Sequence, residues 1–290
     1  MLRDRSPARR PAVCNLMQPL RKRRPKCGYA PSVRSVRAEE VVAEIEAVAI
    51  ANPGGIVATD GDGTLWSGDF GEDLFDAFVE HGRVEEPARV AIDREAREFS
   101  IDASGKPATV ARRIWDAYVA GDYPEERVCE LNTWCFAGWT RDEVATFARE
   151  VVERRGLASR LHAELGRVLE GVRRAGIEII LVSASPRAIV EAAANLVGID
   201  VANVVAATPR YDEKTLLADV ARPIPYGAGK VDGLRARIGE RAVYAAFGDN
   251  VFDLAMLAHA DLAFAVRPKP KLRARAGELP TLRELARIAV

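Results

Sequence analysis

The stretch GIVATDGDGTLW, residues 55–66, passes from an apolar run into two aspartates, Asp60 and Asp62, separated by one glycine. The apolar run predicts a buried strand that ends at Asp60. Two carboxylates so close together at the end of a buried strand resist ionisation, because burial and mutual repulsion both favour the neutral form. A bound cation or a shared proton would relieve this cost. Gly61 and Gly63 allow backbone geometries and close approaches that other residues resist.

Two simpler interpretations of this stretch must be weighed. Asp and Gly both favour turns, so DGDG alone is also compatible with a tight turn. A calcium loop of the EF-hand type needs Asp or Asn at its fifth position, Gly at its sixth and an acid at its twelfth. Those positions hold Thr64, Leu65 and Gly71, so the calcium loop is rejected. The turn interpretation depends on whether other strands bring partners to the same place.

The N-terminal segment differs in charge from the rest of a balanced chain. The 290 residues carry 42 basic and 42 acidic side chains, but Met1–Arg37 holds eleven of the basic ones and a single acid, Asp4. Its prolines and lack of apolar periodicity predict a disordered basic tail over residues 1–38. It has no apolar run typical of a secretory signal. A solvated tail or upstream-start artefact, a nucleic-acid arm and a transit-like leader remain as interpretations. We expect no nucleic-acid partner, because no aromatic residue is interleaved with the basic run at residues 21–24.

The rest of the composition narrows the class of protein. About half of the residues are apolar, enough for a sizeable core, yet no run is long enough to span a membrane. The cysteines lack CxxC spacing and predict reduced thiols in a cytoplasmic protein: Cys14, Cys27, Cys129 and Cys135. The histidines show no metal-ligand spacing and are interpreted as surface or core residues: His81, His162 and His259. The oligomeric state stays open.

The order of elements predicts an α/β fold. We expect strands at 56–60, 177–182, 201–206, 242–247 and 261–266, helices at 39–51, 157–175, 188–196, 229–238 and 251–259, a hairpin within 208–222, and tail elements after 280. Such alternation favours a parallel sheet with helices on both faces. Residues 67–156 look almost wholly helical, and Thr140 with Glu143 predicts a capping box. We therefore expect a core of residues 39–66 and 160–290, with 67–159 as a helical cap domain.

Three of the predicted strands end in polar residues. Asp60 and Asp62 follow the first strand, Ser183 ends the second, and Asp249 ends another. Open α/β sheets bind ligands at the carboxyl ends of their strands, so these side chains are expected to converge. Asp253 lies four residues after Asp249 at a strand-to-helix junction and can face the same site. This convergence disfavours the turn-only interpretation.

The residue types at these strand ends suit phosphoryl transfer, which needs charge neutralisation around a phosphate and an in-line nucleophile. Mg²⁺ prefers carboxylate oxygens, which Asp60 and Asp249 offer. Ser183 precedes a predicted helix, where a hydroxyl and backbone N–H groups form an anion site. Lys230 follows flexible glycines and is a candidate phosphate ligand. Taken singly, Ser183 could be a plain helix cap and Lys230 a surface lysine.

Taken together and in this order, four segments resemble the motifs of the haloacid dehalogenase-like superfamily. They are DGDGT at 60–64, the strand ending in Ser183, Lys230, and GDNVFD at 248–253. The resemblance implies a Rossmann-like three-layer core with an inserted cap. It implies that Asp60 is the nucleophile and that Asp62 is the general acid and base. Ser183 and Lys230 would hold the phosphoryl group. Mg²⁺ would be bound by Asp60, Asp62 through its backbone carbonyl, Asp249 and Asp253.

The identity of residue 62 bears on the reaction type. Dehalogenases of the superfamily lack this aspartate, and the ion-pumping ATPases have threonine there, so Asp62 implies hydrolysis of phosphate esters. The inserted cap and the SASPR segment at 183–187 resemble the phosphoserine phosphatase-like branch. Ser185 of that segment is expected to bind substrate. Asp69 stands where that branch has a glutamate that reads the substrate amine, with Glu72 one turn later, and Phe252 replaces an asparagine.

The aromatic segment NTWCFAGW, residues 132–139, suggests an alternative substrate. Trp139 beside Asp69 or Glu72 could hold a quaternary ammonium by cation–π attraction, which would suit phosphocholine or phosphoethanolamine. The simpler interpretation is aromatic packing between cap helices.

These observations predict a Mg²⁺-dependent phosphomonoesterase. We expect it to act on a small phosphorylated metabolite through an aspartyl-phosphate at Asp60. Two other classes remain as alternatives. One is a protein that is phosphorylated on Asp60 for signalling, against which Asp62 argues because it would activate water. The other is a nucleic-acid-binding protein acting through its basic tail.

Overall fold

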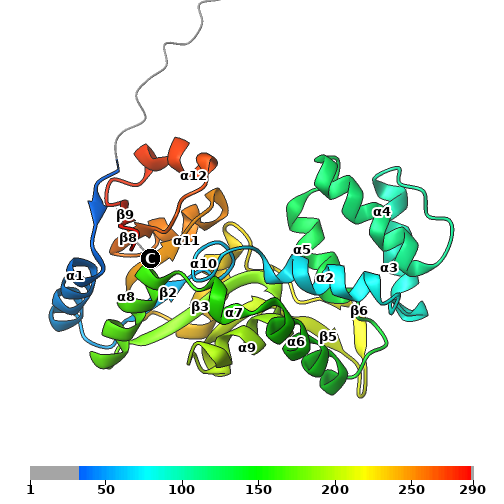
Figure 1. Ribbon diagram of the computed structural model, residues 1–290, viewed down its shortest axis with the longest axis horizontal. Coiled ribbons are helices and arrows are strands. Elements are labelled where there is room, and N and C mark those ends of the chain that lie inside the picture. The colour runs from blue at the N-terminus through cyan, green and yellow to red at the C-terminus, as the bar shows by residue number, and fades with distance from the viewer. Residues whose placement is uncertain (1–32, 289–290) are drawn as a thin grey trace, which may run out of the picture.

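The computed structural model describes residues 33–288 and is built around a seven-stranded sheet (Figure 1). Every neighbouring pair of strands in this sheet is parallel. The order is β1-β9-β8-β7-β2-β3-β4. The strands are β1 (Ser35–Val36), β2 (Ile56–Thr59), β3 (Glu178–Pro186), β4 (Val204–Ala207), β7 (Val243–Gly248), β8 (Leu262–Ala265) and β9 (Arg283–Leu285). The predicted α/β class is confirmed, and β2 lies inside the sheet between β7 and β3.

Alternate residues of the inner strands face two different hydrophobic layers. In β2, Val57 belongs to one layer, whereas Ile56 and Ala58 belong to the other. The first layer contains α1 (Ala38–Ala51), α8 (Ala163–Arg174) and α9 (Arg187–Leu196), and the second contains α10 (Gly229–Ile238), α11 (Leu254–Ala258) and α12 (Pro270–Ala274). The sheet is therefore covered on both faces, which explains why its inner strands are continuously apolar.

A block of helices leaves the sheet after β2 and returns before α8. It holds α2 (Phe70–Glu80), η1 (Glu86–Ala88), α3 (Arg89–Glu98), α4 (Pro107–Ala120), α5 (Glu125–Trp134), α6 (Arg141–Arg155) and α7 (Leu157–Arg160). Figure 1 shows α3 and α4 at the outer end of this block, and α6 packs beside α9. The predicted capping box is present, because Thr140 and Glu143 each accept the other's backbone N–H. We propose that residues 67–159 form a cap domain on a core made by the rest of the described chain.

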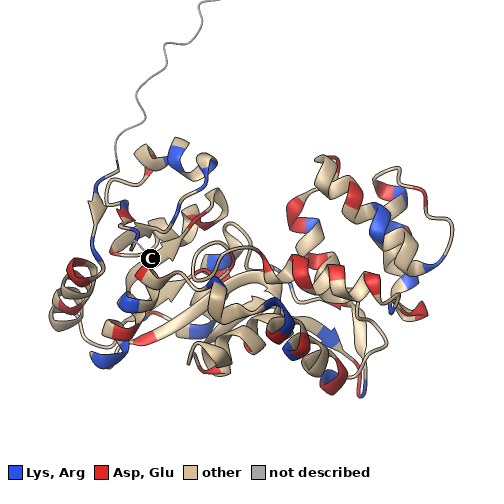
Figure 2. Ribbon diagram, viewed as in Figure 1, with Lys and Arg blue, Asp and Glu red and all other residues tan. Residues whose placement is uncertain are grey.

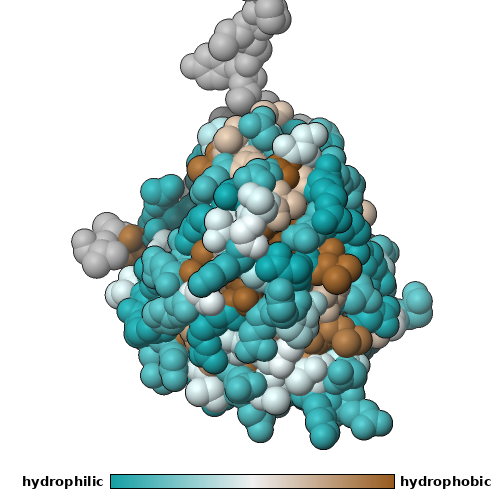
Figure 3. Space-filling model, turned by 90° about the vertical axis from the view of Figure 1, so that its right-hand side faces the viewer, coloured by the Kyte–Doolittle hydropathy of each residue, from teal (hydrophilic) through white to brown (hydrophobic). Residues whose placement is uncertain are grey.

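The outer end of the cap has a mainly hydrophilic surface. Figure 3 shows apolar side chains there in small groups and not as one continuous area. The larger apolar side chains of the cap helices are buried, among them Phe78, Trp115 and Phe147. Within residues 33–288, no helix combines the length and the apolar character that crossing a membrane requires.

The predicted hairpin is formed by β5 (Pro209–Tyr211) and β6 (Leu216–Val220), which are antiparallel. It is hydrogen-bonded to the loop that follows α5. The Gly138 N–H donates to the Leu216 carbonyl at 2.9 Å, and the Leu216 N–H donates to the Trp139 carbonyl at 2.8 Å. The hairpin therefore adds a contact between the core and the cap to the two chain segments that join them, one between β2 and α2 and the other between α7 and α8.

The predicted basic tail is wrong at its C-terminal end. Ser35–Val36 form β1, which pairs with β9, and Val36 is buried. Two backbone bonds hold this strand, from Glu284 N to the Arg34 carbonyl and from Ala286 N to the Val36 carbonyl. A short edge strand of this kind depends on a distant partner and leaves little trace in composition. Residues 1–32, with Cys14 and Cys27, lie outside the described part.

Two other predicted elements have different boundaries. The helix expected at 157–175 is interrupted between α7 and α8, because the His162 N–H donates to the Leu65 carbonyl at 3.0 Å and holds the chain against the loop after β2. The strand expected at 201–206 begins with a 3₁₀ turn, η2 (Val201–Asn203), before β4. The helix expected at 251–259 begins as η3 (Val251–Asp253), and η4 (Ala276–Glu278) precedes β9.

Candidate active site

The polar ends of β2, β3 and β7 meet at the carboxyl edge of the sheet, as the sequence predicted. Asp60 follows β2, and its N–H donates to the Phe247 carbonyl of β7 at 3.0 Å. Ser183 lies near the end of β3, and Asp249 follows β7. All three line one small cavity of about 80 Å³, together with Asp62, Lys230 and Asp253. The turn-only interpretation of residues 60–63 is therefore excluded.

The loop after β2 brings backbone unusually close to Asp249. Gly63 has a φ of +82°, and a β-carbon at this position would lie 2.2 Å from Asp249 Oδ2. The Gly61 carbonyl closes the turn by accepting the Leu65 N–H at 2.8 Å. Glycine at position 63 is thus required both by backbone conformation and by space.

A buried lysine bridges two of the aspartates. Lys230 Nζ lies 2.7 Å from Asp60 Oδ1 and 2.5 Å from Asp253 Oδ1, and all three side chains are buried. Burial raises the pKa of Asp60 to about 8 against the opposing charge of Lys230, and the charges of Asp253 and Asp249 add to the rise. One lysine therefore leaves this group of carboxylates short of positive charge.

The same carboxylates fit a divalent cation. Asp60, Asp249 and Asp253 each offer an oxygen, and these oxygens lie within 4.8 Å of one another. Burial, and then the charge of Asp253, raises the pKa of Asp249 to about 6. Asp253 is oriented by backbone donors, since its Oδ2 accepts from Asp249 N at 3.0 Å and from Asn250 N at 2.9 Å. Oxygen ligands of this kind suit Mg²⁺, and a cation would supply the missing charge.

Asp62 is held in a different orientation from Asp60. Its Oδ1 accepts the Trp66 indole N–H at 2.7 Å and the Phe70 N–H at 2.8 Å. Its Oδ2 accepts the Ser185 hydroxyl at 2.7 Å and lies 3.5 Å from Ser183 Oγ. The carboxylate thus lines the same cavity as Asp60 but lies outside the group of three carboxylates that could hold a metal ion. Because these bonds occupy the Asp62 carboxylate, its backbone carbonyl is the group that would bind the metal.

Three of the predicted substrate-binding residues line the cavity: Asp69, Ser185 and Phe252. Asp69 caps α2 by accepting the Glu72 N–H at 2.9 Å. Burial, followed by the charges of Asp62 and Glu72, raises the pKa of Asp69 well above its usual range. Glu72 is outside the lining; it is half-buried, with the Tyr118 hydroxyl 3.4 Å from its Oε1.

Trp139 is not brought to the cavity. It is buried inside the cap, with ring centroids 5.4 Å from Phe78, 5.3 Å from Phe136 and 5.6 Å from Phe147. The Arg83 guanidinium covers its face at 3.8 Å, so that face is already occupied. Aromatic packing between cap helices is the interpretation that the structure bears out.

Four cavity residues were not found from the sequence: Glu125, Cys129, Tyr226 and Lys269. Lys269 Nζ lies 3.0 Å from Asp249 Oδ2, which makes it a second cation of the site. Tyr226 stands four residues before Lys230, and this closeness in sequence was the one signal that could have placed it at the cavity. Glu125 begins α5, and the start of that helix, like α2, is rich in acidic residues (Figure 2).

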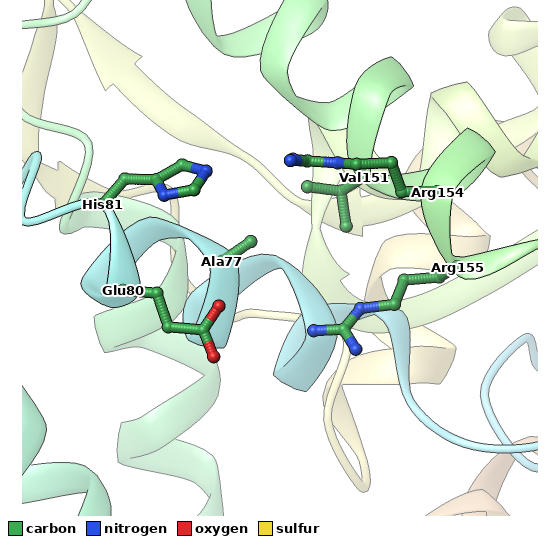
Figure 4. A pocket seen from close by; sticks show the side chains of 6 residues that line it. All are labelled: Ala77, Glu80, His81, Val151, Arg154 and Arg155. Carbon is green, nitrogen blue, oxygen red and sulfur yellow. The ribbon is translucent and has the colours of Figure 1, made fainter.

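A second hollow, of about 270 Å³, lies between α2 and α6. Figure 4 shows the side chains of Arg154 and Arg155 extending from α6 toward Glu80, the last residue of α2, and His81, which follows it. These four residues are exposed to solvent, and the group of carboxylates within residues 33–288 that could hold a metal ion lies elsewhere. Within the described part of the chain, the candidate metal ligands and the predicted catalytic residues therefore lie at the carboxyl edge of the sheet.

The sequence profile of haloacid dehalogenase-like hydrolases matches residues 57–258, which include all four predicted motifs. The chain belongs to this family. The cavity at the sheet edge is thus the candidate active site of a hydrolase. A search among curated proteins found no match.

Solved structures with a similar fold span most of this hydrolase. A protein of unknown function from Bordetella pertussis Tohama I is 21% identical, with a TM-score of 0.62, covering 80% of this chain and 97% of that one. A functionally unknown protein from Anaerococcus prevotii is 15% identical, with a TM-score of 0.61 and coverages of 87% and 92%. A HAD family hydrolase from Salmonella enterica serovar Typhi is 17% identical, with a TM-score of 0.50 and coverages of 81% and 73%. At these identities the likeness concerns the fold alone.

Proposed function

We propose that this hydrolase is a Mg²⁺-dependent phosphomonoesterase that acts through an aspartyl-phosphate on Asp60. The observation that carries the proposal is the placement of Asp62, which four donors hold beside Asp60 without making it part of the carboxylate cluster. Asp60 is thereby available as the nucleophile, and Asp62 is available for proton transfer. A bound Mg²⁺ would neutralise phosphate charge and orient the phosphoryl group.

The reaction follows from these two side chains. An Asp60 oxygen attacks phosphorus, and the bond from phosphorus to the leaving oxygen breaks while Asp62 donates its proton to that oxygen. Asp62 then takes a proton from water, and the resulting hydroxide attacks phosphorus. The bond to Asp60 breaks, inorganic phosphate leaves, and both carboxyl groups return to their starting forms. Ser183 and Lys230 would hold the phosphoryl oxygens throughout.

We further propose a small metabolite as substrate, in a phosphoserine phosphatase-like enzyme of the cytoplasm. The cavity volume of about 80 Å³ supports a small leaving group. The branch assignment rests on the SASPR segment and the inserted cap. The free thiols of Cys129 and Cys135 suit a reducing compartment. Phosphocholine and phosphoethanolamine are alternative substrates, although Trp139 no longer supports them.

The proposal is tested by a screen of small phosphomonoesters, with and without Mg²⁺, on the wild type and on Asp60→Asn. We expect Mg²⁺-dependent phosphate release that falls at least about 1,000-fold in the variant, as for other essential catalytic groups. Turnover that survives Asp60→Asn would show that Asp60 is not the nucleophile.

Asp62→Asn is the companion variant. It keeps the size of the side chain but cannot transfer the proton, so the phosphoenzyme should form from an activated ester and persist. Mass spectrometry of the intact protein would detect the added phosphoryl group. A wild-type phosphoenzyme that is equally long-lived would instead favour a phospho-acceptor protein.

A further inference from the structure

The cavity has an acidic and aromatic part that phosphate binding does not explain. It is formed by Asp69 at the start of α2, Glu125 at the start of α5, and the rings of Tyr226 and Phe252. These rings lie 4.4 Å apart at an angle of 34°. Among the described residues that line the cavity there is no arginine. This part of the wall offers neither the phosphate nor a substrate carboxylate a guanidinium partner among the described lining residues.

The charge of the cavity is unfavourable for an anionic substrate. Six carboxyl groups line it against two lysines, and both lysines are already paired with aspartates. Asp62, Asp69 and Glu125 have no cationic partner within 4 Å among the described residues. A Mg²⁺ ion would roughly offset the charge of the phosphate that it binds, so the cavity would still hold more carboxyl groups than cations. A leaving group that carries a positive charge would offset this excess.

The aromatic pair identifies the kind of cation. Faces of Tyr and Phe attract alkylammonium groups, which are weakly hydrated and fit between rings and carboxylates. Tyr226 remains a neutral phenol, since burial and the nearby Glu125 both raise its pKa. A leaving group with its own carboxylate, such as serine, would add negative charge to a cavity whose two described lining lysines are already paired with aspartates.

We propose that the substrate is the phosphate ester of a short alcohol bearing an ammonium group and no carboxylate, with the ammonium held by Glu125, Asp69 and the Tyr226–Phe252 pair. The proposal rests on the phosphomonoesterase function proposed above. It assigns substrate recognition to Glu125 and Tyr226, in place of the Trp139 that the sequence suggested.

Matched esters test the role of charge at constant shape. Phosphocholine is compared with 3,3-dimethylbutyl phosphate, in which carbon replaces the charged nitrogen, and phosphoethanolamine is compared with propyl phosphate. We expect kcat/KM to favour the charged member of at least one pair by about 10-fold or more, in line with cation–π and carboxylate contacts at a partly desolvated site. Phosphoserine should be a poorer substrate than phosphoethanolamine. Equal values within both pairs, or a preference for phosphoserine, would overturn the proposal.

Glu125→Gln should reduce the charged-to-neutral ratio by about 5-fold or more, because a charge-assisted contact is replaced by a neutral one. The ratio is the informative readout, since a general loss of folded enzyme lowers both rates equally. Glu126→Gln is the matched control: this neighbour is exposed and outside the cavity lining, so the ratio should stay at the wild-type value. An unchanged ratio in Glu125→Gln would contradict the assignment.

Binding to Asp60→Asn separates this proposal from the proposed reaction. If no ester is hydrolysed by the wild type, the phosphomonoesterase function is wrong. Calorimetry with phosphocholine and 3,3-dimethylbutyl phosphate then still decides the recognition site. Tighter binding of the charged ester, lost in Asp60→Asn/Glu125→Gln, supports the site, and equal binding of the two esters refutes it.

Discussion

Replacing Lys230 with methionine tests the electrostatic account of the site most directly. The side chain keeps its length but loses the charge that contacts Asp60 and Asp253. Removing one partner of a buried ion pair typically costs about 3–5 kcal/mol, because the remaining charge is buried without compensation. For a chain of this size, 1 kcal/mol corresponds to a shift of about 2 °C in Tm. We therefore expect Lys230→Met to melt about 6–10 °C below the wild type at neutral pH.

Thermal unfolding followed by circular dichroism, without divalent cations, measures this difference. Lys214→Met is the control, since Lys214 is exposed on the β5–β6 turn and makes no ion pair with a described residue. The deficit of Lys230→Met should grow as the pH rises above 8, because Asp60, whose pKa is about 8 in the folded wild type, then ionises without its partner. A Tm within 2 °C of the control at pH 7 would refute the reasoning, as would a deficit that does not depend on pH.

Three further outcomes follow from the same geometry. Without divalent cations, the free energy of unfolding should fall as the pH rises from about 4 to 8. The reason is that the folded protein raises the pKa of Asp60 to about 8 and that of Asp249 to about 6, and so binds their protons more tightly than the unfolded chain does. Denaturant titrations at each pH measure this fall, and Mg²⁺ should lessen it. Gly63→Ala should weaken Mg²⁺ binding by about 10-fold or more and lower activity, since its β-carbon would collide with Asp249; unchanged calorimetric affinity would contradict this. Ser185→Ala removes a 2.7 Å hydrogen bond to Asp62 and should lower kcat about 10-fold with little change in Tm. The pH–rate profile of the variant should also differ from that of the wild type. An unaltered kcat would show that the bond does not position Asp62.

The central sheet and the aspartates could be predicted because their signals are local. Each apolar run ends in a polar residue, and parallel strands bring such ends to one edge whatever the details of packing. Asp60, Ser183 and Asp249 were therefore placed correctly from strand positions alone. Lys230 needed the family resemblance as well, because nothing in its own segment shows which way the side chain points.

The residues that were missed depend on how the cap and loops lie against the core. Glu125 reaches the cavity only because α5 packs against β3 and β6, a relation between distant segments. Lys269 arrives from the loop after β8 and is held there by a bond from its N–H to the Asp249 carbonyl. Trp139 shows the reverse case. The many aromatic residues at 132–139 predicted a contact with substrate, but their number does not show which way each side chain points, and the Trp139 ring packs inside the cap.

The short strand β1 has a practical consequence for recombinant work. Ser35 and Val36 cover β9, which would otherwise present unpaired N–H and C=O groups along the margin of the sheet. Exposed margins of this kind recruit strands from other molecules and promote aggregation. A shortened version that removes the arginine-rich region for better expression should therefore retain residues from Val33 onward. One that begins at Glu39 would lose Val36 from the core and leave β9 open to self-association.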